Sequence, residues 1–212
     1  MTDYTKLDYA RSALITIDTQ CDTLDGQTLE IPGTSAALPN MLALLCAFRE
    51  LRRPIVHIVR IYKRDGSNVD LCRRGAVEGG AQMLLEGHDG CELADALFPD
   101  AQVHLDHELL LAGGVQSVGL NEVVIYKSRW GAFYKTPLED HLRSFNVNSL
   151  VFAGCNFPNC PRTSMYEASE RDFRIALAED ALSGLYDQGK KELENIGIKV
   201  VTTSDILNKI MA

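Results

Sequence analysis

Short apolar runs alternate along the chain with segments that repeat apolar residues at helical spacing. The runs are rich in β-branched residues and cover residues 13–17, 55–59, 123–126, 150–153, 175–178 and 198–202. Each run is too short for a helix and is mostly apolar without alternating polar positions, which is typical of a strand covered on both faces. The alternation therefore predicts a parallel sheet with helices packed on its two sides.

The helical segments carry their own start signals. The apolar positions that recur at helical spacing in the first of them are Leu38, Met41, Leu42, Leu45 and Phe48. Ser35 or Asn40 is the expected cap of that helix. A second start lies at Thr136, because a proline follows in the first turn and a Glu stands three residues after the capping Thr. Further helices are expected over residues 92–98 and 161–171, and at the end of the chain with Ser204 as cap.

The composition agrees with one ordinary globular domain. The chain has 212 residues, of which 46% are hydrophobic and 24% charged, so it is long enough to bury a full core. No internal repeat or linker divides it. We therefore predict an α/β fold over residues 1–212, a three-layer α/β/α sandwich with a six-stranded, mainly parallel, Rossmann-like sheet.

Charge and cysteine usage exclude several classes of protein. The net charge of −8 disfavours a nucleic-acid binder, which normally carries a basic surface. No apolar run approaches the roughly 18 residues of a membrane helix, and the first residues lack the order of a signal peptide. We expect a cytoplasmic protein with neither a nucleic-acid nor a membrane partner. The six cysteines have no regular spacing and no CxxC motif, which disfavours a disulfide framework or a zinc knuckle.

Three reactive side chains follow three of the predicted strands. Asp18 follows the first strand, Lys127 follows the third, and Cys160 comes shortly after the fourth. Because sites in parallel sheets lie beyond the carboxyl ends of the strands, these groups converge if the strands are neighbours. The ammonium would stabilise a thiolate, and the carboxylate would take the thiol proton. Singly, these residues are more often a cap, a surface lysine and a buried thiol, but their combination favours catalysis.

Three stretches of the sequence carry a resemblance to a known family. They are ALITIDTQ at residues 13–20, VIYKSRWGAFYKTPLEDHLR at residues 124–143, and FAGCNFPNC at residues 152–160 with the helix after it and AEDA at residues 178–181. In this order and spacing, the chain resembles the isochorismatase-like cysteine hydrolases over nearly its whole length. That family includes nicotinamidases, N-carbamoylsarcosine amidases, and biuret and maleamate amidohydrolases.

The resemblance implies a role for each residue at the strand ends. Asp18 would be the general base and acid, Lys127 would stabilise the thiolate, and Cys160 would be the nucleophile. The family also has a glycine six residues before the nucleophile, which matches Gly154. Cys155 is then expected to be structural rather than a redox partner of Cys160.

The turn before the nucleophile departs from the family pattern. The resemblance implies an oxyanion hole made by the N–H groups of Phe157 and Cys160. It also implies a cis peptide bond at Asn156–Phe157, with Phe157–Pro158 as a competing position. The bulk of Phe157 is expected to narrow or reshape the substrate pocket.

Five residues near these positions are candidates for substrate binding. They are Gln20, Arg60, Trp130, Phe133 and Asn156. Arg60 could orient a carbonyl or carboxylate of the substrate, or it could pair with an acid. Trp130 and Phe133 could form an apolar wall or belong to the core. Arg73 and Arg74 are expected on the surface.

No metal and no other cofactor is expected. Metal-containing nicotinamidases carry Asp-x-His after the second strand, where this chain reads Val-Arg-Ile-Tyr-Lys at residues 59–63, so nicotinamidase-type specificity is not expected either. His104 and His107 flank Asp106 on a predicted surface helix and are the remaining candidates for metal ligands. A nucleophilic thiol favours acyl transfer over the vinyl-ether hydrolysis of true isochorismatases.

Together these features predict a hydrolase that cleaves a small amide or ureide through a thioester. The alternative is a non-catalytic binding or interaction module that keeps the fold, which the unusual residues 157–159 suggest. The resemblance also implies a homodimer or homotetramer.

Overall fold

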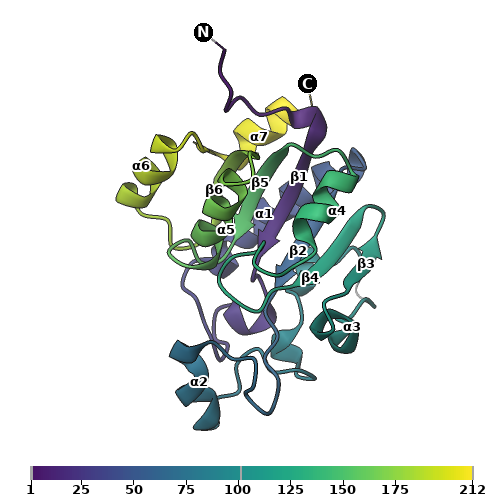
Figure 1. Ribbon diagram of the computed structural model, residues 1–212, viewed down its shortest axis with the longest axis vertical. Helices are drawn as coiled ribbons and strands as arrows, with labels where there is room; N and C mark the ends of the chain where they lie inside the picture. Colours follow the sequence, from purple (N-terminus) through teal and green to yellow (C-terminus); the bar gives the residue numbers. More distant parts are fainter. Residues whose placement is uncertain (1, 101, 212) are drawn as a thin grey trace.

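A seven-stranded sheet forms the centre of the molecule, in the order β3-β4-β2-β1-β5-β6-β7 (Figure 1). The computed structural model describes residues 2–100 and 102–211. The strands are β1 Ser12–Ile17, β2 Ile55–Val59, β3 Val115–Gly119, β4 Glu122–Tyr126, β5 Ser149–Gly154, β6 Arg174–Leu182 and β7 Lys199–Val201. The helices are α1 Thr34–Glu50, α2 Leu71–Glu78, α3 His107–Leu111, α4 Leu138–Ser144, α5 Cys160–Ser169, α6 Asp187–Asn195 and α7 Thr203–Ile210.

The central strands β1, β2 and β5 are buried along their whole length, as their apolar sequences require. Side chains of β1 alternate between two cores, with Leu14 on one face and Ile15 and Ile17 on the other. The parallel register sets Ile17 opposite both Ile58 of β2 and Gly154 of β5. The carboxyl ends of these strands therefore lie level, and the residues that follow them share one edge of the sheet.

Helices cover the two faces of the sheet in two groups. Helices α1 and α7 pack on one face, where Met41 and Ile206 are fully buried. Helices α4, α5 and α6 cover the other face and bury Leu142, Met165 and Leu193. Figure 1 shows α4 and α5 in front of the sheet and α1 behind it. The predicted three-layer α/β/α sandwich is confirmed. No helix within the described ranges has the length and apolar character needed to span a membrane.

Residues 63–90 form an excursion beyond the carboxyl ends of the strands. Helix α2 belongs to this excursion and stands apart from both helical layers at the lower end of Figure 1. None of its residues is buried. Tyr62, Val69 and Leu84 form a small separate core that anchors the excursion. The pattern did not predict α2, because no apolar face marks it.

The sheet has one strand more than predicted. Strand β3 pairs antiparallel with β4 at the edge of the sheet, with Val115 opposite Ile125. Its residues are half-buried or exposed, and the sequence VQSVG contains no continuous apolar run. The prediction of six strands is therefore wrong by this edge strand, whereas the six predicted strands are all present.

Two helices, α1 and α7, are capped by residues other than those predicted. Helix α1 begins after Gly33, which has a left-handed φ of 87°, and neither Ser35 nor Asn40 is its cap. Helix α7 is capped by Thr202 in a capping box, and not by Ser204.

The predicted helix at Thr136 begins two residues later, at Leu138. Residues 92–98 do not form one helix, because the chain there makes the 3-10 turns Asp89–Cys91 and Asp95–Leu97. The predicted helix over residues 161–171 is confirmed as α5.

Candidate active site

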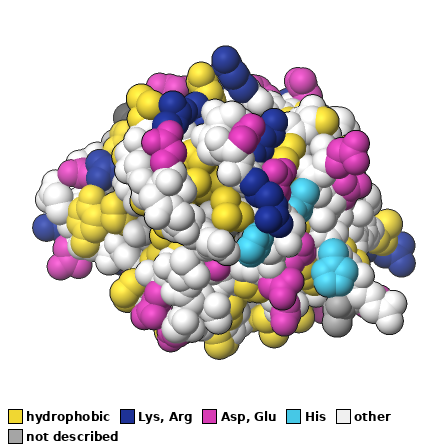
Figure 2. Space-filling model, turned by 90° about the horizontal axis from the view of Figure 1, so that it is seen from below, with side chains coloured by type: hydrophobic (Ala, Val, Ile, Leu, Met, Phe, Trp, Pro, Cys, Tyr) yellow, Lys and Arg dark blue, Asp and Glu magenta, His cyan; other side chains and the backbone are white. Residues whose placement is uncertain are grey.

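Polar side chains follow the carboxyl ends of neighbouring strands and meet at one site. Asp18 follows β1, Arg60 follows β2 and Lys127 follows β4, and these strands are adjacent in the sheet. Cys160 is the first residue of α5 and comes after the turn that follows β5. Figure 2 shows the molecule from this end, where basic side chains lie among acidic and histidine side chains. The fold thus brings Asp18, Lys127 and Cys160 together.

Asp18 and Lys127 form a buried ion pair. Nζ of Lys127 lies 2.7 Å from Oδ2 of Asp18. Lys127 is fully buried, and Asp18 is 7% exposed. The other oxygen of Asp18, Oδ1, is buried without a hydrogen-bond partner among the described residues. Asp18 also has a left-handed φ of 49°, a strained conformation that clusters at functional sites in proteins.

The thiol of Cys160 is protonated at neutral pH. Burial, followed by the negative charge of Asp18, raises the pKa of Cys160 to about 11, although the charges of Lys127 and Arg60 act in the opposite direction. Nη2 of Arg60 lies 3.7 Å from the sulfur. The sequence led us to expect a thiolate stabilised by the ammonium. The charge of Lys127 acts in the expected direction, but desolvation and the carboxylate of Asp18 outweigh the two cations, so the net shift favours the protonated thiol.

The turn between β5 and α5 is held tightly against the end of β1. Gly154 has a φ of 125°, and a Cβ there would overlap the backbone of Ile17, so only glycine allows this approach. The thiol of Cys155 donates to the carbonyl of Asp18 at 3.0 Å. Burial raises the pKa of Cys155 to about 12. Cys155 therefore positions the backbone of Asp18 and carries no reactive thiolate.

The backbone donors of this turn differ from the expected oxyanion hole. The N–H of Phe157 donates to the carbonyl of Ser183 at 2.9 Å, so the expectation that it is a free donor is wrong. Over the described residues, the N–H groups of Asn156 and Cys160 have no acceptor. The described residues contain no cis peptide bond, so the expectation of one at Asn156–Phe157 or Phe157–Pro158 is also wrong.

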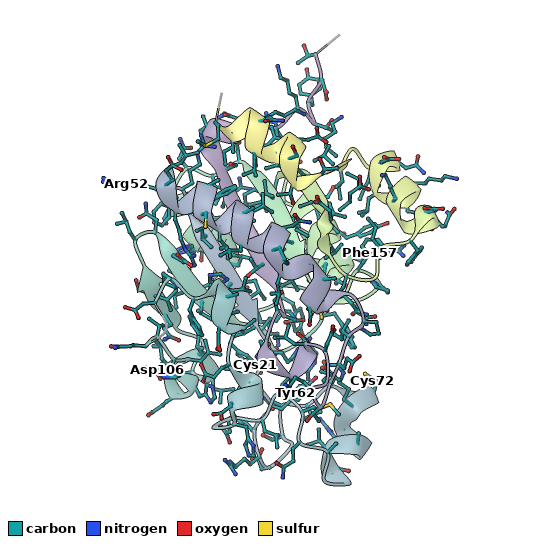
Figure 3. The ribbon with its side chains drawn as sticks, turned by 180° about the vertical axis from the view of Figure 1, so that it is seen from behind. Cys21, Arg52, Tyr62, Cys72, Asp106 and Phe157 are labelled. Carbon is teal, nitrogen blue, oxygen red and sulfur yellow. The ribbon has the colours of Figure 1, made fainter. Side chains whose placement is uncertain are left out.

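The side chain of Phe157 packs into the layer of α6 (Figure 3). Its ring meets that of Tyr186 edge-on, with 5.3 Å between the centroids. A Cβ on Gly189 of α6 would overlap the same ring. The ring of Phe157 therefore packs against α6, and the expectation that it narrows or reshapes the substrate pocket stays a prediction.

The guanidinium of Arg60 is buried and already paired. Its Nη1 lies 2.5 Å from Oδ2 of Asp70, and the hydroxyl of Tyr62 donates to the same oxygen at 2.7 Å. Arg60 also donates to the carbonyls of Ser128 and Arg129. Of the two interpretations that the sequence left open, the structure shows the ion pair with an acid.

The amide of Gln20 is fully engaged by the backbone. Its Oε1 accepts from the N–H of Arg60 at 2.8 Å. Its Nε2 donates to the carbonyls of Arg60 and Cys91 at 2.8 and 2.5 Å. Gln20 is therefore not placed for the expected substrate contact, and it fixes the end of β2 instead.

Two other candidates for substrate binding have different surroundings. Phe133 is buried against Phe173, with 5.9 Å between the ring centroids, so it belongs to the core and not to a wall of the site. Asn156 is half-buried, and its Oδ1 accepts a hydrogen bond from the side chain of Asn159 at 3.2 Å. Its backbone N–H has no acceptor among the described residues.

Arg73 of α2 lies at the site, although the sequence placed it on the surface. Its guanidinium donates to the hydroxyl of Tyr62 at 3.0 Å. The guanidinium carbon lies 5.3 Å from the ring centre of Trp130, and that of Arg60 lies 5.4 Å from the same centre. No sequence pattern marks Arg73, because α2 is brought to the site only by the path of the excursion. Arg74 instead donates to a backbone carbonyl of the loop before α2.

The histidine pair is not assembled as a metal site. Helix α3 begins at His107, so His104 lies outside it. Nδ1 of His107 accepts a hydrogen bond from the backbone of Gly87, and Asp106 caps α3. Within the described part of the chain, no group of three His, Cys, Asp or Glu side chains could hold a metal ion.

The fold and the site define a three-layer α/β protein with a buried Asp–Lys pair next to a thiol at a helix N-terminus. The model of the isochorismatase domain matches residues 12–205, from the start of β1 into α7. The chain therefore belongs to the isochorismatase family.

Known relatives of the chain include amidohydrolases. A protein of Arabidopsis thaliana named as a probable inactive nicotinamidase is 25% identical over 201 residues, which cover 92% of this chain and 93% of that protein. Maleamate amidohydrolase of Pseudomonas putida is 25% identical over 213 residues, which cover 94% of this chain and 87% of that protein. A solved isochorismatase family protein from Desulfovibrio vulgaris has a TM-score of 0.80 at 24% identity, covering 95% of this chain and 99% of its own. The family membership supports an enzyme of the amidohydrolase type.

Proposed function

We propose that this protein is a cysteine hydrolase that cleaves a C–N bond of a small amide or ureide. Cys160 is the nucleophile, Asp18 is the general base and then the general acid, and Lys127 balances the charge of Asp18. Membership of the isochorismatase family and the likeness to maleamate amidohydrolase support this reaction class.

The reaction proceeds in two halves through a thioester. Asp18 takes the thiol proton as the sulfur of Cys160 attacks the carbonyl carbon, which forms a C–S bond and an oxyanion. The intermediate then collapses, the C–N bond breaks, and Asp18 gives the proton to the leaving ammonia or amine. In the second half water attacks the thioester and Asp18 accepts its proton. The C–S bond breaks, and the proton returns to the sulfur as the carboxylic acid leaves.

One observation carries the proposal: a buried carboxylate oxygen of Asp18 is left unpartnered beside a protonated thiol. Lys127 occupies only Oδ2, at 2.7 Å, and Oδ1 has no partner among the described residues. Because the pKa of the Cys160 thiol is raised to about 11, the nucleophile must be generated by a base inside the site. Asp18 is the carboxylate that lies against the thiol and adds to that rise.

The oxyanion would be held by the free N–H groups of Asn156 and Cys160. Asn156 begins the turn and Cys160 ends it as the first residue of α5, so the N-terminus of that helix adds a favourable field for negative charge at Cys160. This pair replaces the one expected from the sequence, because Phe157 already donates to Ser183.

Ammonia release from a panel of small amides tests the proposal. The panel holds half-amides of dicarboxylic acids, N-carbamoyl amino acids, biuret and nicotinamide. We expect turnover of at least one member, and a loss of about 10⁴-fold or more in Cys160→Ala. Cys46→Ala removes an exposed thiol far from the site in sequence and serves as the matched control. Full activity in Cys160→Ala would overturn the mechanism.

A second candidate function is a non-catalytic binding module. It is favoured by the Arabidopsis relative named as probably inactive and by the near closure of the site, where Cys160 is only 5% exposed. This function predicts binding of a small molecule at the same residues and no ammonia release from any amide of the panel. Turnover that depends on Cys160 excludes it.

A further inference from the structure

Three cationic side chains lie around the thiol, but only two carboxylates balance them. Lys127 pairs with Asp18 at 2.7 Å, and Arg60 pairs with Asp70 at 2.5 Å. Arg73 has no carboxylate within ion-pair distance anywhere in the described chain. With Cys160 protonated, the site therefore carries one positive charge in excess.

Neutral groups hold the guanidinium of Arg73 at the site. Nη1 donates to the hydroxyl of Tyr62 at 3.0 Å, and the guanidinium carbon lies 5.3 Å from the ring centre of Trp130. Tyr62 is itself fixed by its hydrogen bond to Asp70. Arg73 and Cys160 are close enough for their charges to interact. The unpaired cation is thus oriented at the reaction centre and is not a freely moving surface group.

We propose that Arg73 binds a carboxylate of the substrate, so that the preferred substrates are small amides or ureides that carry a carboxylate apart from the scissile C–N bond. This inference rests on the proposed function. A guanidinium is suited to the task, because it binds a carboxylate through two parallel N–H···O bonds. The chain as a whole carries a net charge of −8, which repels anions at long range. Selection of an anion must therefore come from a local group such as Arg73.

The other two cations are less suited to bind the substrate carboxylate. Arg60 and Lys127 each already have a buried carboxylate partner. A substrate carboxylate placed on either of them would bring two negative charges together in a poorly solvated site, which is unfavourable. Arg73 is the cation whose charge a substrate can neutralise without such repulsion.

The experiment compares two amides that differ only in one charge. These are the half-amide of butanedioic acid, which carries one carboxylate, and the neutral diamide of the same acid. Wild-type protein should have a higher kcat/KM for the half-amide. The preference is the ratio of the two kcat/KM values, so that a general loss of activity cancels.

Substitution of Arg73 should remove this preference. In Arg73→Met the ratio should fall by about 10- to 100-fold, the range of a charge-assisted hydrogen bond, and mainly through the KM of the half-amide. Arg73→Lys should restore part of the ratio. Arg74→Met is the matched control on the same helix and should leave the ratio unchanged, because Arg74 donates only to a loop carbonyl. An unchanged ratio in Arg73→Met, or no preference in the wild type, would overturn the inference.

A binding measurement separates failure of this inference from failure of the proposed function. Trp130 is the single tryptophan of the sequence, and Arg73 contacts its ring, so its fluorescence reports on the site. Butanedioate should change the fluorescence of Cys160→Ala and should not change that of Cys160→Ala with Arg73→Met. If no amide is hydrolysed, the proposed function fails while this response still supports the carboxylate site. An absent response, or an equal one in both proteins, would overturn the carboxylate site.

Discussion

At Asp18 the two carboxylate oxygens have different surroundings. Oδ2 meets the ammonium of Lys127 at 2.7 Å, while Oδ1 is buried without a partner among the described residues. The same carboxylate adds to the rise in the pKa of Cys160. Burial and this carboxylate together favour the protonated thiol in the free protein, and with substrate the carboxylate would become the acceptor of that proton.

Asp18→Asn should separate these two effects. Because the negative charge of Asp18 raises the pKa of the Cys160 thiol, its removal should lower that pKa below about 11 and speed alkylation of Cys160 at mildly alkaline pH. Turnover should nevertheless fall by about 10²- to 10⁴-fold, because the general base is lost. Mass spectrometry of alkylated Cys160 and ammonia release measure the two quantities. Slower alkylation, or retained turnover, would contradict the role given to Asp18.

Lys127→Met should destabilise the protein strongly. Lys127 is fully buried, so its loss leaves the charge of Asp18 without its partner. Breaking a buried pair in this way costs about 3–5 kcal/mol. The matched control is Lys190→Met, which breaks a solvent-screened pair with Glu179 and should cost far less. Urea denaturation measures the free energy of unfolding, and equal losses in the two variants would argue against a buried pair.

At the scale of elements, the sequence predicts those that bury continuous apolar surface. Strands β1, β2 and β5 are buried along their whole length and mostly apolar in sequence, and they were located correctly. Strand β3 lies at the sheet edge, and α2 packs no buried residue, so neither leaves a periodic signal. Their positions depend on tertiary contacts that no local pattern encodes.

Gly189 lets helix α6 pack closely on Phe157 in the turn before Cys160. Gly189→Ala should cost about 1–3 kcal/mol of unfolding free energy, because its Cβ would overlap the ring of Phe157 in a packed core. Gly75→Ala in α2 meets open space and should be neutral or stabilising by up to about 1 kcal/mol. Chemical denaturation of both variants is the measurement. A Gly189→Ala protein as stable as the wild type would mean that α6 is not packed on Phe157.

At the scale of the whole molecule, the positions of the reactive side chains were predicted from the sequence more accurately than those of the groups that surround them. Asp18 and Lys127 directly follow strands, so the rule for parallel sheets brings them to one edge. The prediction that the N–H of Phe157 is free to hold the oxyanion was wrong, because this N–H donates to the carbonyl of Ser183, which is far away in the sequence. Arg73 reaches the site only through the excursion of the chain. The homodimer or homotetramer and the cytoplasmic location stay predictions.

A buried network far from the thiol links β2, β4 and α1. Glu122 receives two hydrogen bonds from Arg49, at 2.9 and 2.7 Å, and one contact of 2.8 Å from His57. Burial alone would raise the pKa of Glu122, but the hydrogen bonds of Arg49 and His57 outweigh it and lower the pKa to about 2. Since the folded pKa is depressed, this stability is complete above the ordinary value near 4.5 and is lost as the pH falls toward 2.

Glu122→Gln should therefore change the acid sensitivity of the fold. The wild type should exceed the variant in unfolding free energy by about 3 kcal/mol above about pH 5, and this difference should shrink toward pH 2. Glu192→Gln, in a partly exposed pair with Arg162, is the control and should differ from the wild type by about 1 kcal/mol or less throughout. Urea denaturation across this pH range is the measurement. A constant difference for Glu122→Gln would show that its carboxylate has no depressed pKa.

The proposed thioester on Cys160 can be observed directly by mass spectrometry. Wild-type protein is mixed with a hydrolysed amide, quenched in acid during turnover, and analysed as intact protein and as peptides. We predict a mass increase equal to the acyl group on the peptide that contains Cys160, and none in Cys160→Ala. Turnover without an adduct in the wild type, together with undiminished ammonia release by Cys160→Ala, would contradict the proposed chemistry.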